Sequence, residues 1–133
     1  MVKFAFVSVV AAAILLSGCA TTEIQPMSKD TFKIATDTSS DCGSSGARSV
    51  AFKAAAIEVI RRGGDKFILL TDTTDASLQG DFFSGFDTGY SQGMVVKMIN
   101  DGSAEANNAL SARGQLGADW QEIVAKGVPE TCT

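Results

Sequence analysis

The order of hydrophobic and polar positions predicts a strand and then a helix after residue 30. Residues 31–36 alternate around Phe32 and Ile34, which is typical of a short, half-buried strand. Residues 47–62 contain no glycine or proline, and their apolar positions recur at spacings of three and four, which predicts an amphipathic helix. We expect Ser44 or Ser45 to cap its start, because their hydroxyls accept hydrogen bonds from a first helical turn. Its left-handed stop is expected at Gly63-Gly64.

Two further apolar runs, residues 66–71 and 94–99, are bounded by turn residues and predict core strands. Residues 103–113 and 118–126 have helical composition. The side chains expected to be buried in these two helices are Ala104, Ala109, Leu110, Trp120, Ile123 and Val124.

These elements predict an α+β fold: a small sheet of about three strands with helices packed on one face, in the order β-α-β-β-α-α. The helix at 47–62 is a crossover connection. We therefore expect the strands at 31–36 and 66–71 to run parallel if they share a sheet, with a right-handed connection.

The first eighteen residues have the profile of a signal peptide. Lys3 supplies a positive start, and the thirteen residues from Phe4 to Leu16 contain one polar side chain, Ser8. Such a run rises about 20 Å as a helix, less than the roughly 30 Å of a hydrocarbon core, so a permanent transmembrane span is disfavoured.

The run ends in Leu16-Ser17-Gly18-Cys19, which resembles the lipobox of bacterial lipoproteins. The resemblance implies a diacylglyceryl group on the Cys19 sulfur, cleavage between Gly18 and Cys19, and acylation of the new amino terminus with a fatty acid such as palmitate. Ala20 is not the aspartate of the inner-membrane sorting signal, so the resemblance implies an outer-membrane lipoprotein facing the periplasm if the envelope is Gram-negative. The alternative is an ordinary signal peptide whose cleavage site happens to contain a cysteine.

The chain therefore divides into a lipoprotein signal peptide (1–18), a lipidated N-terminus and tether (19–31) and a single α+β domain (32–133). The tether is mostly polar, contains Pro26 and has no periodicity. Twelve extended residues reach at most about 40 Å, so we expect the domain to stay near its membrane.

Three cysteines are an odd number for an exported protein. If Cys19 carries lipid, Cys42 and Cys132 remain as a pair in an oxidising compartment, and we predict a disulfide between them. The alternative is two free thiols.

Charge and composition exclude some functions. The net charge is −4, and removal of residues 1–18 takes away Lys3 and leaves −5. An acidic chain without a Lys/Arg cluster beyond Arg61-Arg62 does not suit nucleic acid. The absence of histidine removes the commonest general base and metal ligand.

The segment 73–93 combines four glycines with four of the eight aromatic residues that follow Cys19. A long aromatic loop suggests a surface for a protein partner, peptidoglycan or a membrane. The competing interpretation, slightly favoured, is a long hairpin whose aromatics fold back over a sheet edge. The candidate partner-binding residues are Phe82, Phe83, Phe86 and Tyr90.

Other motifs have ordinary structural explanations. Asp72, Asp75, Asp81 and Asp87 do not match a calcium loop and fit solvated turns. Residues 43–46 match no phosphate-binding pattern and fit helix capping. Ser44, Ser45 and Ser49 have no histidine to activate them, and Lys53 fits a solvated helix position. We expect no catalytic residue, no metal and no cofactor besides the lipid on Cys19.

The leading hypothesis is a non-enzymatic envelope lipoprotein that is anchored to a membrane and binds an envelope protein or peptidoglycan through its aromatic loop or a sheet edge. A second hypothesis is an envelope-stress or redox sensor that uses Cys42 and Cys132. The third, a cell-wall hydrolase, ranks last because no catalytic cluster can be assembled.

Overall fold

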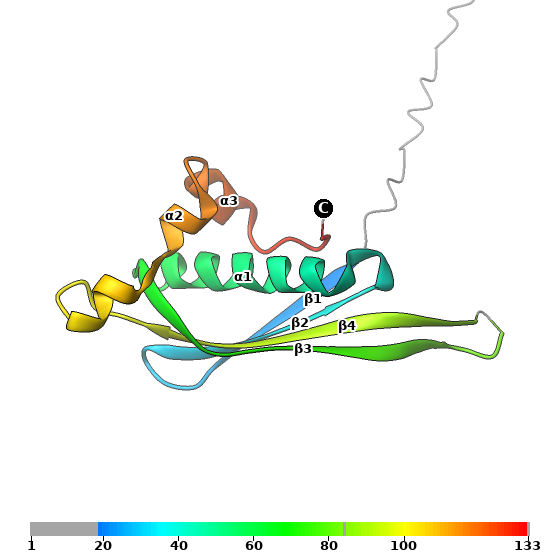
Figure 1. Cartoon of the computed structure of the whole chain (residues 1–133). Helices are drawn as coiled ribbons and strands as arrows, with labels where there is room; N and C mark the ends of the chain where they lie inside the picture. Colours follow the sequence, from blue (N-terminus) through cyan, green and yellow to red (C-terminus); the bar gives the residue numbers. More distant parts are fainter. Residues whose placement is uncertain (1–18, 84, 133) are drawn as a thin grey trace, which may run out of the picture.

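The computed structural model describes residues 19–83 and 85–132, so the predicted signal peptide at 1–18 lies outside the described residues. The fold is α+β: one five-stranded antiparallel sheet, in the order β1-β2-β4-β3-β5, with one long helix and shorter helices (Figure 1). The strands are β1 Ala20–Pro26, β2 Thr31–Thr38, β3 Lys66–Asp81, β4 Gly85–Met98 and β5 Leu110–Ser111. The α-helices are α1 Gly43–Arg61, α2 Ala112–Leu116 and α3 Trp120–Lys126, with 3-10 helices at Ser40–Cys42 and Ala104–Asn108.

The predicted tether is wrong, because most of it is the edge strand β1. Ala20 pairs with Thr38 and Pro26 with Phe32 in a continuous antiparallel register with β2. Ala20 is buried, and Thr22 and Ile24 on the same face are less exposed than their neighbours. The strand is mostly polar because only one of its faces meets the core, so the sequence lacks the apolar alternation that signals a strand.

The prediction that the strands at 31–36 and 66–71 run parallel is confirmed. β2 and β3 each run antiparallel to β4, which lies between them, so β2 and β3 are parallel to each other. The sheet has five strands instead of three because β1 and β5 add an edge strand at each side. β5 is only two residues long, and it pairs with Lys66 and Phe67 at the start of β3.

The segment 73–93 is not an irregular loop. It completes the two long strands β3 and β4, which pair continuously from Thr71↔Val95 to Asp81↔Gly85. The hairpin interpretation is therefore confirmed. A register shift lies between Leu69 and Thr71, and Leu70 at this bulge is half-exposed. The bulge lets an unbroken apolar run continue as an alternating strand.

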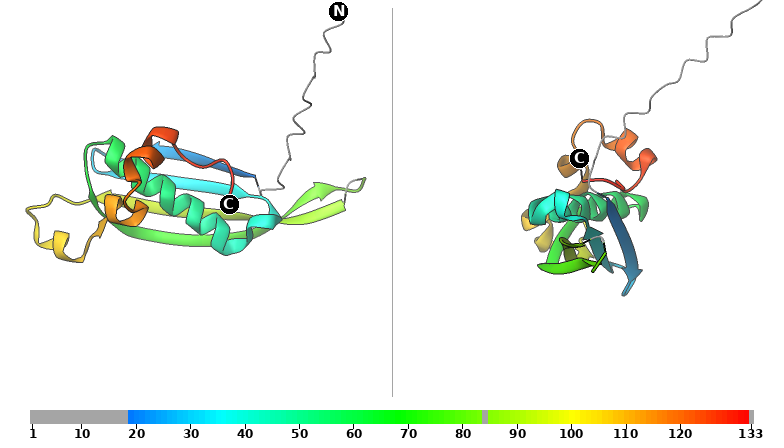
Figure 2. Two further views of the ribbon diagram at one scale, coloured as in Figure 1. Left: turned by 90° about the horizontal axis from the view of Figure 1, so that it is seen from above. Right: turned by 90° about the vertical axis from the view of Figure 1, so that its right-hand side faces the viewer.

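Helix α1 lies across one face of the sheet, and α2 and α3 contact α1 on its other side (Figures 1 and 2). Both sides of α1 are therefore covered, which explains why its middle is buried nearly all round. Small side chains allow this close approach from two directions. The fully buried alanines are Ala47, Ala51, Ala54, Ala55 and Ala56.

Helix α1 starts differently from the prediction but stops where it was predicted to stop. The helix begins at Gly43 after Cys42, with no side-chain cap hydrogen bond, so capping by Ser44 or Ser45 is wrong. The backbone N–H of Cys42 instead donates to the Ser39 carbonyl, through the preceding 3-10 turn. The predicted stop is confirmed: Gly63 has a φ of +86°, which favours glycine.

The core forms between α1 and the sheet. Phe32 and Ile34 from β2, Phe67 from β3, and Met94 and Val96 from β4 are fully buried against the alanines of α1. Burial of these apolar side chains is the main stabilising contribution to the fold.

The predicted helices after residue 102 are shorter than expected. Residues 104–108 form a 3-10 helix, and pairing of β5 with β3 interrupts the helical stretch before α2. Trp120 is half-buried, so its predicted place in the core is wrong. It is the first residue of α3, and the Arg113 guanidinium lies 5.0 Å from the centroid of its ring. Ala104 is exposed.

Asp65 holds β5 and α2 to the start of β3. Its carboxylate accepts hydrogen bonds from the Arg113 backbone N–H at 3.0 Å and the Ser111 hydroxyl at 2.8 Å, and its carbonyl accepts one from the Ala112 N–H. Burial alone would raise the pKa of Asp65, but these two donors, with the charges of Arg113 and Lys66, outweigh it and hold the pKa below its ordinary value.

Asp65→Asn is expected to lower the free energy of unfolding by about 1 kcal/mol at pH 7. Because the pKa of Asp65 is lower in the folded state than in the unfolded state, its charge stabilises the fold when the pH is above the unfolded-state pKa. This stabilisation is lost as the pH falls through the folded-state pKa. The difference between wild type and variant should therefore shrink below about pH 4. Urea unfolding from pH 7 to pH 2.5 measures it, and a pH-independent difference would show that the charge of Asp65 contributes nothing.

Candidate functional site

Cys19 begins the fold directly. Its carbonyl accepts a hydrogen bond from the Ser39 N–H at 3.1 Å, and it forms an isolated antiparallel bridge with Thr131. The next residue, Ala20, donates its N–H to the Glu130 carbonyl at 2.7 Å. The Cys19 side chain is exposed and its thiol is free. A group attached to the Cys19 sulfur would therefore be joined to the fold with no flexible segment between them.

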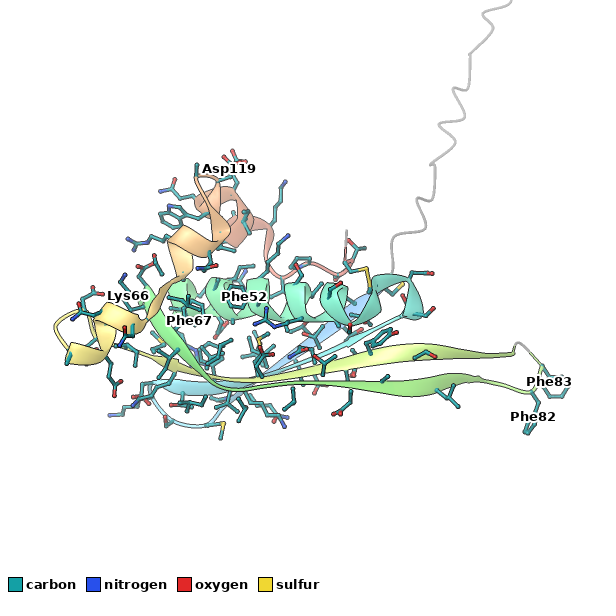
Figure 3. The ribbon with its side chains drawn as sticks, viewed as in Figure 1. Phe52, Lys66, Phe67, Phe82, Phe83 and Asp119 are labelled. Carbon is teal, nitrogen blue, oxygen red and sulfur yellow. A yellow bond between two sulfur atoms is a disulfide. The ribbon has the colours of Figure 1, made fainter. Side chains whose placement is uncertain are left out.

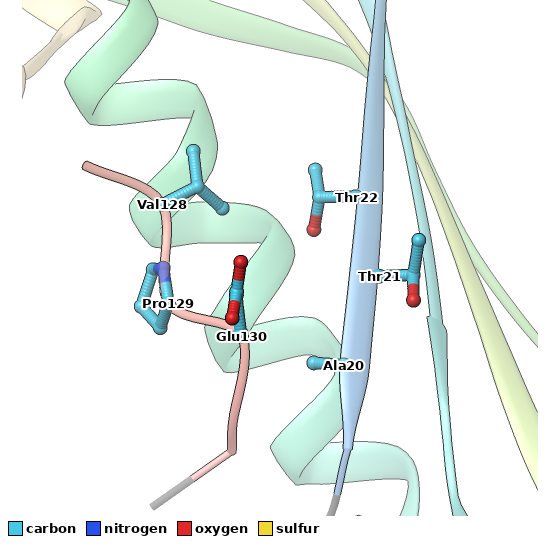
Figure 4. Close-up of a pocket in the computed structure, with 6 residues that line it drawn as sticks. All are labelled: Ala20, Thr21, Thr22, Val128, Pro129 and Glu130. Carbon is cyan, nitrogen blue, oxygen red and sulfur yellow. The ribbon is translucent and has the colours of Figure 1, made fainter.

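The partner of Cys19 and Ala20 is the C-terminal strap, residues 127–132, which runs along α1 beside β1 (Figures 1 and 4). A cavity of about 370 Å³ lies between the strap and β1. Its lining is shown in Figure 4: Ala20, Thr21, Thr22, Val128, Pro129 and Glu130. Glu130 is the one ionisable side chain in this lining, so the cavity presents no acid–base pair.

The predicted disulfide is present. Cys42 and Cys132 are bonded, with their Cα atoms 5.6 Å apart, and the bond ties the C-terminal strap to the start of α1. A side chain at Gly46 would bring its Cβ within 3.0 Å of the Cys42 Cβ and 3.5 Å of the Cys132 Cβ. Glycine at position 46 therefore provides the space for the disulfide. Both cysteines are half-buried.

The second feature is the hairpin arm, residues 77–89, which is the end of the β3–β4 hairpin. Among the described residues, no third strand pairs with the five register pairs from Ser77↔Gly89 to Asp81↔Gly85. Five residues of a strand extend about 17 Å. The arm projects past the first turn of α1 in two views (Figures 1 and 2).

The arm carries the most exposed large apolar side chains of the described residues. Phe82 is 93% exposed and Phe83 100%, and Figure 3 shows both rings at the tip of the hairpin. Leu78, farther back on the arm, is 76% exposed. The expectation that aromatics fold back over a sheet edge is therefore wrong for Phe82 and Phe83. Their exposure leaves apolar contact area at the end of the molecule.

The four predicted partner-binding aromatics do not form one cluster. Phe82 and Phe83 lie at the tip, whereas Tyr90 lies at the base of the arm, pairs with Thr38 and is half-buried. The Tyr90 carbonyl accepts a hydrogen bond from the Thr38 hydroxyl at 3.4 Å. The Phe86 side chain lies outside the described residues.

A polar network at the base of the arm joins it to α1. Gln92 of β4 is 1% exposed; its amide donates to Asp72 at 2.5 Å and accepts from the Thr74 hydroxyl. Asp72 also forms an ion pair with Arg48 of α1 at 2.8 Å. The buried amide is satisfied by these contacts, which orient the arm relative to the helix layer. Sequence reasoning missed this network, although a glutamine at an inward position of a strand could have signalled it.

Cys19 and the arm lie at the same end of the sheet. Ala20 at the start of β1 pairs with Thr38 at the end of β2, and Thr38 pairs with Tyr90, where the arm begins. The arm therefore continues outward from the row of residues next to Cys19. The sequence could not show this, because the residues are brought together by the register of three strands.

The four aspartates lie in strands and not in the predicted turns: Asp72, Asp75 and Asp81 in β3, and Asp87 in β4. Asp72 belongs to the network with Arg48 and Gln92, and the Asp81 and Asp87 side chains lie outside the described residues. Residues 43–46 form the first turn of α1. No group of three or more potential metal ligands is found in residues 19–83 and 85–132. Within the same residues, no helix is both long and apolar enough to cross a membrane.

The sequence and the structure were compared with known proteins. No protein-family model, no curated protein and no solved structure matches the chain.

Proposed function

We propose that this protein is a bacterial lipoprotein, anchored to a membrane of the cell envelope through lipid on Cys19, that acts as a non-enzymatic binding module through its hairpin arm. The observation that carries the proposal is the shared position of Cys19 and the arm at one end of the sheet. An anchor and a projecting apolar tip at the same end suit a protein that works at a membrane surface.

The lipid anchor is supported by the lipobox and by the fold behind it. Cys19 is exposed, so its sulfur can carry a bulky substituent. The fold begins at the next residue, so the predicted cleavage between Gly18 and Cys19 would leave the whole sheet intact. Ala20 at the following position supports an outer-membrane destination in a Gram-negative envelope.

Binding through the arm is supported by its shape and chemistry. The arm is held by pairing within the hairpin and by the Gln92 network at its base, so its tip is presented without a large ordering cost. Aromatic side chains on such a support provide rigid contact area. The partner classes are an envelope protein, peptidoglycan or the membrane itself.

Cys19→Ala is expected to abolish incorporation of labelled fatty acid and to release the protein from the membrane fraction. Stable attachment needs more than one acyl chain, and the lipobox cysteine carries all of them. Metabolic labelling with an alkynyl palmitate analogue and fractionation of envelopes measure both. The matched control, Cys42→Ala/Cys132→Ala, should keep its label. Labelling that survives Cys19→Ala, or is absent from the wild type, would contradict the proposal.

A redox sensor is the second candidate, and the position of the disulfide favours it. Cys132 lies in the C-terminal strap, next to Thr131, which bridges Cys19. Reduction by a thiol would free the strap from α1 and loosen the segment behind the anchor. Treatment of intact envelopes with a graded thiol buffer, followed by alkylation, tests it. A disulfide that stays oxidised at every concentration the envelope tolerates would eliminate this function.

A further inference from the structure

We propose that the tip of the hairpin arm, Phe82 and Phe83, inserts into the interfacial region of the bilayer that holds the lipid on Cys19. The inference rests on the lipid anchor proposed above and names the partner of the arm as a lipid surface. The molecule would then contact its membrane at two points, the acylated cysteine and the aromatic tip.

The arm is long enough to reach the bilayer from the anchor. Cys19 is bridged to Thr131 and followed by the buried Ala20, so the anchor holds the end of the sheet against the bilayer. The arm leaves the sheet from the same row of paired residues and extends about 17 Å beyond it. Because no tether separates Cys19 from the sheet, a projection of this length can reach the surface of the bilayer that holds the anchor.

The exposed apolar area of the described residues lies mainly on the arm. The three most exposed large apolar side chains of the described residues, Leu78, Phe82 and Phe83, all lie on the arm. Toward the opposite end of the sheet, the exposed large apolar side chains are Met27, which is 60% exposed, and Leu70, which is 53% exposed. Exposed apolar area is thus concentrated at the end that the anchor would turn toward the membrane.

The polar groups of the arm limit how deeply it can insert into the bilayer. A two-stranded arm has unpaired backbone groups along its edges, and these groups are costly in hydrocarbon. Asp81 directly precedes the two phenylalanines in the chain, and Asp87 follows on the returning strand. Insertion is therefore restricted to the tip, at the depth of the headgroups and the first acyl carbons.

The charge of the hairpin specifies the kind of surface. Between Lys66 and Lys97 the chain contains no lysine or arginine and four aspartates, Asp72, Asp75, Asp81 and Asp87. Attraction to anionic lipid cannot drive the contact, since that requires basic residues near the surface. We expect tip insertion to be at least as strong on zwitterionic as on anionic bilayers, because anionic lipid repels the aspartates, and insertion into zwitterionic bilayers should change little with salt.

The test uses the lipidated protein, purified from membranes and reconstituted into phosphatidylcholine vesicles. Phe83→Trp in a Trp120→Phe background places a single indole at the tip. Phosphatidylcholine with bromine on the upper acyl carbons should quench this indole about twofold or more, because interfacial side chains lie roughly 5–10 Å deep. The matched control, Met27→Trp in the same background, puts the indole on an exposed apolar position at the opposite end and should not be quenched.

The outcomes separate the two proposals. If the protein carries no lipid and does not associate with the vesicles, the anchor fails. If it is lipidated and vesicle-bound but the tip indole is no more quenched than the Met27→Trp control, tip insertion is wrong. A third outcome combines two measurements: the tip indole is not quenched in vesicles, and residue 83 crosslinks to a protein in native envelopes. This outcome would also overturn tip insertion and would assign the arm to a protein partner. Circular dichroism of both variants checks that the fold is kept.

Discussion

Replacing Cys42 and Cys132 with serine is expected to lower the free energy of unfolding by roughly 4 to 5 kcal/mol, because the disulfide closes a long loop and constrains the unfolded chain. The bonded residues are 90 positions apart and enclose α1 and most of the sheet. A loss of this size is a large fraction of the total stability of a small domain.

Urea unfolding of the domain in a Cys19→Ala background measures the effect without interference from the third thiol. The reduced form with both cysteines present should have the same stability as the serine pair, since both lack the cross-link. A second readout is local: the Ala20 N–H, which donates to Glu130 in the strap, should exchange faster with solvent once the strap is released. A loss below about 1 kcal/mol would mean that the unfolded chain is not appreciably restricted by the bond.

Phe32→Ala is expected to cost about 3 to 5 kcal/mol, whereas Phe82→Ala and Phe83→Ala should each cost less than about 0.5 kcal/mol. Phe32 is 0% exposed beneath α1, and the Arg62 guanidinium lies 4.5 Å from its ring centroid. Truncation there leaves a cavity and removes packing on both sides. At the tip of the arm, the same truncation removes atoms that are already in water.

All three variants replace phenylalanine with alanine, so a difference in their stability loss depends only on the position of the residue. Thermal or urea unfolding of the three variants gives the values. A substantial loss of stability in either tip variant would show that the tip packs against the domain in solution, and would count against its role as a binding surface. A small loss in Phe32→Ala would contradict the core described above.

The sequence predicted the elements whose pattern is local. Helix α1, its glycine stop at Gly63 and the core strands around Phe32 and Phe67 were recognised because apolar spacing and turn residues report on a segment's own conformation. The parallel relation of β2 and β3 also followed from the connection through α1. The disulfide was predicted from the number of cysteines.

Predictions from the sequence were wrong for segments whose conformation depends on contacts with distant parts of the chain. The composition of the polar segment after Cys19 predicts a tether, yet pairing with β2 and the C-terminal strap makes it a strand. Trp120 was expected in the core, but α3 packs on the outer side of α1 and leaves the ring half-buried. In both segments the local pattern is weak, and long-range contacts override it.

By itself the sequence determined the composition of the core helix and strands, the pairing of Cys42 with Cys132, and the lipobox on which the proposed anchor depends. Only the tertiary structure decided that Cys19 is joined to the fold without a tether and that the aromatic segment splits into a half-buried base and an exposed tip. It also decided that Cys19 and the tip share one end of the molecule. The reason is physical: strand register brings together residues about 60 positions apart, and no local spacing encodes that register.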